Sequence, residues 1–452
     1  MTTKQHIQKS LALAFPVILT QVGQISVNVV DSIMVGKLGS DKIAAVSLAN
    51  AVFYSVLLFG IGFSFSISPL VAQAHAKHKI KRIKNVFKHS LFLNISLSIF
   101  LFLLLYFCIP LLDYTHQTPE ILPDAKIFLL INLASLLPFM IFQTYRQTAE
   151  GLSIIFPVTI ATIIANLLNV LLNYALIYGN WGFPKMEVEG SAWATFISRV
   201  VMCVLLILFL HNYKKSKIYF NAISYIKVKK DYFRKLIQLG FPTACQMFFE
   251  VSAFAIAAFI CGYNSQTNEL AAHQITINLA SISFMICTGL GVSATIRVGN
   301  QLGLQDFKTL QKAAFTNIFL VIIFMSFCGI IFIMCRNILP AYYLKEGQDV
   351  EVLAIAANLM IIAALFQISD GIQVVALGAL RGLQDVKIPT IITFVAYYVV
   401  TLPLAWVLAV VFDYKALGVW IALGIGLCIS AILLIWRLRN KTNKLIYLNN
   451  KL

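Results

Sequence analysis

Apolar residues form about twelve long stretches along the chain, separated by short polar segments. Each stretch is close to the roughly 20 residues that an α-helix needs to cross a lipid bilayer. The pattern therefore predicts an all-α, polytopic membrane protein of about twelve transmembrane helices. The expected helices cover residues 11–33, 48–74, 90–112, 125–145, 157–179, 190–211, 237–260, 270–296, 314–335, 351–379, 389–411 and 418–436.

The two halves of the chain carry similar short motifs in the same order. Phe15-Pro16 opens the first half and Phe241-Pro242 opens the second, while GIGFS (60–64) is similar to GLGVS (289–293). A repeat of six helices in the same direction predicts two related six-helix bundles, and transporters hold substrates and ions between or inside such bundles.

The longest polar loop, residues 211–235, divides the expected helices six and six. We therefore place an N-lobe at residues 1–220 and a C-lobe at residues 221–452, which ends in a basic tail. The loop itself is interpreted as a solvated basic linker.

The chain has a formal net charge of +17, although 60% of its residues are hydrophobic and only 12% are charged. Lys and Arg concentrate in alternate loops such as 75–89 and 211–235, whereas loops 113–124 and 180–190 are neutral or acidic. This is the positive-inside pattern, so we expect an inner-membrane protein with both termini in the cytoplasm. It also argues against nucleic acid as a partner, because the basic residues do not share one soluble face.

No motif of a soluble enzyme is present, and the loops are too short for a catalytic domain. The sequence lacks a G-x-x-x-x-G-K-[ST] phosphate loop and an H-E-x-x-H metal-binding helix. Its eight cysteines form no C-x-x-C pair and are interpreted as small buried hydrophobic residues. We expect neither an enzyme nor a resident cofactor, so the protein would draw its energy from an ion gradient.

Three carboxylates interrupt the apolar stretches: Glu250, Asp370 and Asp31. A charged side chain deep in a bilayer costs about 2.5–3.5 kcal/mol on insertion scales, so it needs a partner or a function. A buried carboxylate can exchange a proton, and with further oxygen ligands it can hold Na⁺. The alternative is that hydrogen bonds neutralise each acid and that it only joins helices.

Further polar residues fall in the expected N-lobe helices. Asn169 and Asn173 are four residues apart and so project from one helical face, and Thr195 faces inward if its helix is regular. Asparagines within spans also serve as plain interhelical hydrogen bonds, which leaves both interpretations open. Arg199 lies in the same apolar stretch as Thr195, where it either reaches the interface or pairs with an acid.

Several stretches together resemble one family, the multidrug and toxic compound extrusion (MATE) transporters of the NorM type. They are FPVILTQVGQISVNVVDSIMVGKLG (15–39), AEGLSI (149–154), LAAHQI (270–275), GLGVSATIRVGNQLG (289–303) and SDGIQVVALGALRGLQD (369–385). The resemblance covers nearly the whole chain. It implies a multidrug antiporter that exports cationic, aromatic compounds in exchange for inward Na⁺ or H⁺, by alternating access around a cleft between two lobes.

The resemblance also implies roles for particular residues. Glu250 and Asp370 fall on the C-lobe acids that bind the coupling cation, where Na⁺ would be held, and Asp31 falls on the N-lobe acid. Asn169, Asn173 and Thr195 fall on the polar N-lobe cluster.

The expected partners are cationic drugs, Na⁺ or H⁺ and the lipid bilayer, and we expect a monomer. A flippase for lipid-linked precursors, from the same superfamily of folds, is the alternative function. It would call for a basic cavity to receive phosphates, whereas the candidate residues in this sequence are acidic.

Overall fold

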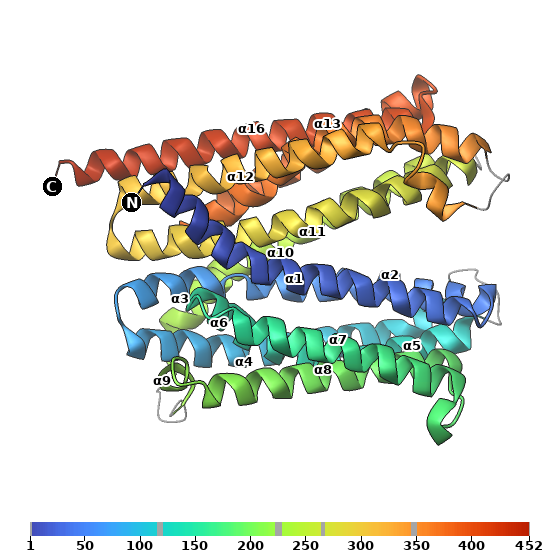
Figure 1. Ribbon diagram of the computed structural model, residues 1–452, viewed down its shortest axis with the longest axis horizontal. Helices are drawn as coiled ribbons and strands as arrows, with labels where there is room; N and C mark the ends of the chain where they lie inside the picture. The colour runs from blue at the N-terminus through green and yellow to red at the C-terminus, as the bar shows by residue number, and fades with distance from the viewer. Residues whose placement is uncertain (1, 115–120, 222–227, 264–266, 345–349, 452) are drawn as a thin grey trace. The chain divides into compact units, whose positions relative to one another are not determined.

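A computed structural model describes residues 2–114, 121–221, 228–263, 267–344 and 350–451 (Figure 1). Within this part of the chain, all regular structure is helical. Twelve helices there are long and apolar enough to cross a membrane. The predicted fold class is therefore confirmed.

The described elements follow one another as helices joined by short connections. They are α1 (Thr3–Gly36), α2 (Ser40–Ser64), α3 (Ile67–Ala76), α4 (Ile80–Cys108), α5 (Leu122–Ala134), α6 (Leu136–Gly151), α7 (Phe156–Tyr178), α8 (Glu187–Asn212), α9 (Lys217–Phe220), α10 (Lys230–Cys261), α11 (Thr267–Leu304), α12 (Phe307–Met334), α13 (Val350–Gly382), α14 (Lys387–Phe394), α15 (Leu402–Trp406) and α16 (Lys415–Asn449). Two π-helical segments, Val395–Thr401 and Val407–Val411, flank α15, so that α14 and α15 form one membrane-length span.

Several boundaries differ from those expected from the sequence. The span expected at 48–74 is divided between α2 and α3, and the span at 125–145 between α5 and α6. The basic segment 75–89 was expected to be a loop, but α4 begins at Ile80. Ile83, Val86 and Phe87 are buried at helical spacing, and this apolar face continues the helix into the basic segment. Residues 115–120 of the expected neutral or acidic loop 113–124 lie outside the described residues.

Packing divides the chain into two compact units. The N-unit is Leu19–Ala244, and the C-unit combines Met1–Ile18 with Cys245–Leu452. Their limits are not those of the two lobes expected from the sequence, because α1 and α10 each begin in one unit and end in the other. Within the C-unit, the long helices α11, α12, α13 and α16 pack side by side (Figure 1).

A proline precedes both points where a helix changes unit. Pro16 lies inside α1, two residues before the limit at Ile18, and Pro242 lies inside α10, two residues before the limit at Ala244. Each proline removes one intrahelical hydrogen bond, which weakens the helix at that position. The repeated Phe-Pro motif therefore marks the place where each half of the chain crosses from one unit into the other.

The repeated glycine motifs are found where these exchanged half-helices pack. In the C-unit, a Cβ added at Gly289 would lie 2.5 Å from Ile18 Cγ1, and Ser293 donates a hydrogen bond of 3.0 Å to the Ser10 carbonyl. In the N-unit, a Cβ added at Gly240 would lie 2.9 Å from the Phe63 ring. Small residues thus allow each half-helix to approach the unit that it joins.

Candidate functional site

Gln373 lies at the centre of a polar cluster in the C-unit. Its Nε2 atom donates to Glu250 Oε1 at 3.2 Å and to the Tyr397 hydroxyl at 2.8 Å. The Tyr397 hydroxyl also interacts with Glu250. Three separate segments therefore meet here: α10 brings Glu250, α13 brings Gln373, and the π-helical segment after α14 brings Tyr397.

The π-helical turn explains how Tyr397 reaches the cluster. Pro403 follows the turn and has no backbone N–H, so the regular α-helical hydrogen-bond pattern cannot continue through it. Within the turn, the Thr401 side-chain hydroxyl also donates to the carbonyl of Ala396, five residues earlier, at 2.8 Å. Wide turns of this kind occur often at functional sites, because the added residue shifts which side chains face inward.

Asp370 lies one turn before Gln373 on α13 and is only 6% exposed. It is within electrostatic reach of Glu250. Phe366, one turn earlier still, packs on Trp420 with ring centroids 5.3 Å apart, and Trp420 Nε1 donates to His273 Nδ1 at 3.0 Å. The structure therefore brings Glu250 and Asp370 into one cluster. The packed rings of Phe366 and Trp420 begin one helical turn before Asp370.

Buried polar atoms on α13 at and near this cluster lack hydrogen-bond partners in the described structure. Gln373 Oε1 is buried without a hydrogen-bond partner among the described residues, and so are both polar atoms of the Gln367 side chain. Arg381 is the cation within electrostatic reach of Glu250. If both carboxylates are ionised, they and the guanidinium together carry one net negative charge. Carboxylate and amide oxygens are also the ligands that hard cations prefer.

A second polar cluster lies in the N-unit around Asp31. Asn173 Nδ2 donates a short hydrogen bond to Asp31 Oδ1, and a second one of 3.1 Å to Asn169 Oδ1. Both asparagines are buried on α7. Thr195 of α8 is not hydrogen-bonded to Asp31 or to either asparagine in the described structure. Three of the four predicted N-lobe residues are therefore brought together, and the fourth is not linked to them.

Arg199 is held by aromatic rings and does not form an ion pair with Asp31 in the described structure. Its guanidinium carbon lies 4.9 Å from the centroid of the Phe53 ring and 5.4 Å from that of Phe139. Its Nη1 atom donates to Ser135 Oγ at 2.5 Å. Desolvated cation–π contacts of this kind are worth about 2 kcal/mol, which helps to keep the charge buried.

Sequence reasoning missed Tyr397, His273 and the aromatic partners of Arg199 as members of these clusters. Tyr397 had a signal in the sequence, because a proline six residues later predicts a disturbed helix. His273 lies within LAAHQI, one of the stretches that carry the family resemblance. The rings of Phe53 and Phe139 have no such signal, since phenylalanine is abundant throughout the apolar stretches.

Comparisons with known proteins give a family match, relatives and solved structures of the same fold. A sequence model of the MatE family matches residues 16–175 and 242–407, and both stretches begin at a proline of the repeated Phe-Pro motif. The multidrug resistance protein NorM of Photobacterium profundum is 34% identical over 441 residues, which cover 96% of each chain. A probable multidrug resistance protein NorM of Agrobacterium fabrum is 32% identical over 95% of this chain and 92% of its own. Among solved structures, a eukaryotic MATE transporter has the same fold, with a TM-score of 0.87 at 20% identity over 98% of both chains.

Proposed function

Because this chain belongs to the MatE family of transporters, we propose that it is a secondary active multidrug antiporter. It exports cationic, lipophilic compounds in exchange for inward Na⁺ or H⁺, by alternating access. It works as a monomer in the inner membrane, with both termini in the cytoplasm.

The observation that carries this proposal is the acid pair around Gln373. Two carboxylates, the partly buried Glu250 and the buried Asp370, lie in one cluster, whose net charge is negative when both are ionised, even with Arg381 counted. An empty, ionised pair in a low-dielectric interior is unfavourable, because the two charges repel and have lost their hydration. A bound proton or Na⁺ relieves that cost, and so does a cationic drug.

Exchange follows if each cation favours a different state of the transporter. A ligand shifts a conformational equilibrium only by the difference between its affinities for the two states. The coupling ion would stabilise one state at Glu250 and Asp370, and the drug would stabilise the other. One cation then displaces the other, and the ion gradient drives drug export.

Aromatic rings beside Glu250 support a lipophilic cation as the substrate. Phe249, the residue before Glu250, packs with Phe394 and Tyr398, and the three ring centroids lie 5.1 to 5.6 Å apart. Such rings attract organic cations through their π faces. The same negative cluster would repel the phosphates of a lipid-linked precursor, so the flippase alternative gains no support from this site.

The test is ethidium export from proteoliposomes in which the Na⁺ gradient and the pH gradient are imposed separately. We expect export against the ethidium gradient with at least one of the two ion gradients and none without either. Ethidium movement that is independent of both gradients would contradict the antiporter proposal.

A further inference from the structure

The last helix of the chain, α16, is longer than a bilayer requires. It has 35 residues, which extend over about 52 Å at 1.5 Å per residue. Residues 416–436 contain no charged side chain and cover about 31 Å, which matches the hydrocarbon core of about 30 Å. Trp436 ends this stretch and is 62% exposed, as expected of an aromatic side chain at a membrane–water interface. Residues 437–449 therefore continue the helix beyond the hydrocarbon core, and we call them the α16 extension.

The repeated fold does not require this extension. When the two repeats are aligned on Trp193 and Trp420, the last residue of α8, Asn212, corresponds to Arg439. The C-unit helix instead continues to Asn449. The extra turns therefore need an explanation of their own.

One face of the α16 extension packs on the C-unit. Leu438 and Thr442 are buried, and Leu445 packs against the hydrophobic core of this unit. Gln311 of α12 donates hydrogen bonds to Thr442 Oγ1 at 3.1 Å and to Asn443 Oδ1 at 2.7 Å. These contacts fix the extension on the C-unit and leave its opposite face for another partner.

Two basic residues of the extension are neutralised by the protein itself. Arg437 Nε lies 2.9 Å from Asp385 Oδ2, and Lys441 Nζ lies 3.6 Å from the same oxygen. The Asp385 side chain is largely buried, so both cations are drawn toward the C-unit. They are therefore not available to bind an outside anion.

Arg439 and Lys444 lie on the other side of the extension. Both are exposed, and neither forms an ion pair with a carboxylate in the part of the chain that the structure describes. They follow Trp436 by three and eight residues, which places them on the helical face that carries Trp436. Lys451 adds a further positive charge, 4.7 Å from the centroid of the Tyr447 ring. This face is therefore basic and has no acidic partner among the described residues.

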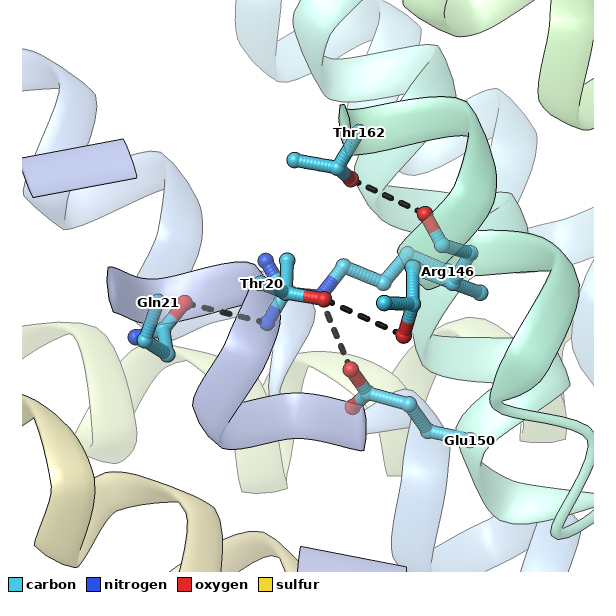
Figure 2. Close-up of polar contacts among 7 residues, drawn as sticks. Thr20, Gln21, Arg146, Glu150 and Thr162 are labelled. Atoms are coloured by element: carbon cyan, nitrogen blue, oxygen red, sulfur yellow. Dashed lines mark hydrogen bonds and ion pairs between the residues drawn. The ribbon is translucent and has the colours of Figure 1, made fainter. Parts of the chain in front are cut away.

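Two other arginines in membrane-length helices have partners within the protein. Arg146 forms an ion pair of 2.8 Å with Glu150 and donates to Gln21 of α1 at 3.3 Å (Figure 2). Arg297 donates to the carbonyl of His6 at 2.9 Å. Arg439 differs from both, because its charge is directed toward the surroundings of the protein.

The depth of Arg439 and Lys444 matches the headgroup layer of a bilayer. They follow Trp436 by about 4.5 Å and about 12 Å along the helix axis, and each headgroup layer is about 5–8 Å thick. Side chains of an α-helix point back toward its N-terminus, which for the α16 extension is the bilayer side. The long side chains of Arg and Lys can therefore reach lipid phosphates from these positions.

We propose that Arg439 and Lys444 form a binding surface for the headgroups of anionic phospholipids. The Arg439 guanidinium donates two hydrogen bonds to a phosphate, and the Lys444 ammonium supplies a second positive charge beside it. This inference goes beyond the proposed antiport, and it uses the proposed topology only to place the surface at the inner leaflet.

The surface is continuous with the lipid-facing side of α16, which favours a lipid over a soluble anion. Ile432 and Trp436 are 65% and 62% exposed, and they lie on the same helical face as the two cations. A phospholipid meets this apolar part with its acyl chains and the cations with its phosphate. An acidic protein or a nucleic acid would have to displace headgroups in order to reach the same face.

The test measures amide hydrogen exchange of residues 437–449 in the whole protein. The protein is placed in nanodiscs of phosphatidylcholine alone, or of equal amounts of phosphatidylcholine and phosphatidylglycerol with the same acyl chains. Exchange should be slower by at least about fivefold in the mixed nanodiscs, because one basic residue near an anionic surface contributes about 1 kcal/mol. This protection should disappear at about 1 M salt, where the Debye length is about 3 Å.

Two double variants separate the binding surface from net charge. Arg439→Gln with Lys444→Gln should remove the protection by phosphatidylglycerol, while glutamine preserves helix propensity. Arg437→Gln with Lys441→Gln is the matched control, because it removes the same two residue types from the side that faces Asp385. In the control, exchange should become faster in both nanodiscs, but the ratio between them should stay that of the wild type.

Three results would overturn the lipid surface. They are equal exchange of the wild type in the two nanodiscs, an equal loss of protection in both double variants, and the same protection from inorganic phosphate in phosphatidylcholine nanodiscs. The single variants Arg439→Gln and Lys444→Gln decide the outcome if their double variant does not fold. None of these measurements involves ion-driven export, so failure of the lipid surface and failure of the antiporter proposal are distinguishable.

Discussion

Gln373 of α13 donates its side-chain amide to the Glu250 carboxylate of α10 at 3.2 Å. The same nitrogen donates to Tyr397, so one amide links three segments and leaves its own carbonyl oxygen buried without a partner. This bond fixes the position of the Glu250 carboxylate relative to α13. The unpaired oxygen would supply a further ligand if the coupling cation binds here, as we propose.

The π-helical segment that positions Tyr397 depends on a glycine of α16. A Cβ added at Gly426 would lie 1.7 Å from Thr401 Oγ1. We expect Gly426→Ala to destabilise the protein by about 1–3 kcal/mol, as overpacking of a well-packed core does. The measurement is the thermal midpoint of folded protein, followed by size-exclusion chromatography.

Gly424→Ala is the control for that variant, because its added Cβ would meet only Phe366 Cβ at 3.6 Å. It should melt close to the wild type. Removing the obstructing hydroxyl, in the double variant Gly426→Ala with Thr401→Ala, should recover part of the loss. Equal midpoints for Gly426→Ala and Gly424→Ala would show that the close approach to Thr401 is unimportant.

The N-unit cluster should behave as one functional group of residues. Asp31→Asn and Asn169→Ala should each reduce ethidium export while expression stays near normal. Because Asn173 bonds to both residues, the double variant should lose less than the sum of the two single losses. Strictly additive losses, measured as export rates at equal protein, would assign the two residues separate structural roles.

The start of α12 offers a pH test outside the membrane-spanning helices. Asp306 is the N-cap, and Thr309 hydrogen-bonds its carboxylate through both its side chain and its N–H, the latter at 3.0 Å. These bonds hold the pKa of Asp306 below its ordinary value. The stabilisation is therefore complete above the unfolded-state pKa of about 4 and is lost as pH falls through the folded-state pKa.

Asp306→Ala should consequently lower stability by about 1 kcal/mol at pH 7, the usual effect of losing an N-cap. The difference from the wild type should shrink as pH falls below about 4. Asp306→Asn, which keeps an N-cap without a titratable group, should lose less stability than the wild type over the same pH range. Thermal midpoints at several pH values measure this. A difference that stays constant down to pH 3 would mean that the Asp306 charge is not involved.

The twelve membrane-length helices could be predicted from the sequence. The exchange of half-helices between the two units could not. Twelve long apolar stretches determine twelve helices, because in a bilayer every backbone group must be bonded within its own segment. The exchange of half-helices at Pro16 and Pro242 escaped prediction, since only the packing of Ile18 on Gly289 and of Gly240 on Phe63 reveals it.

At the candidate sites, too, the sequence indicated some residues, whereas others depended on the three-dimensional structure. Glu250, Asp370 and Asp31 were predictable because a charge in an apolar stretch requires an explanation. Pro403 indicates a disturbed helix near Tyr397, but the direction of the Tyr397 side chain was not predictable, because a π-helical turn changes the helical period on which such predictions rely. Thr195 was expected in the N-lobe cluster, and its place on α8 leaves it without a hydrogen bond to that cluster.

Membrane orientation is testable through exposed lysines of the connecting segments. Cysteines introduced at Lys79 and Lys217 should react only with reagents that reach the cytoplasm, and one at Lys185 only with reagents from outside. This follows from the positive-inside rule applied to the basic loops. Labelling of the Lys217 position by an impermeant reagent added outside would overturn the assigned topology.

The central claim is that Glu250 and Asp370 bind the coupling cation. Glu250→Gln and Asp370→Asn should each abolish ion-driven export without unfolding the protein, because a neutral amide is easier to bury than a charge. Glu351→Gln is the matched control, since Glu351 lies on the same helix as Asp370 but at its exposed first turn, where it accepts from Asn268.

The most direct measurement is ethidium export by Glu250→Gln protein in energised vesicles, with folded yield determined by size-exclusion chromatography. We predict a normal folded yield and no ion-driven export, while Glu351→Gln exports at the wild-type rate. Export near the wild-type rate in Glu250→Gln would contradict the coupling role, reduce Glu250 to a structural partner of Gln373, and make Asp31 the leading acid.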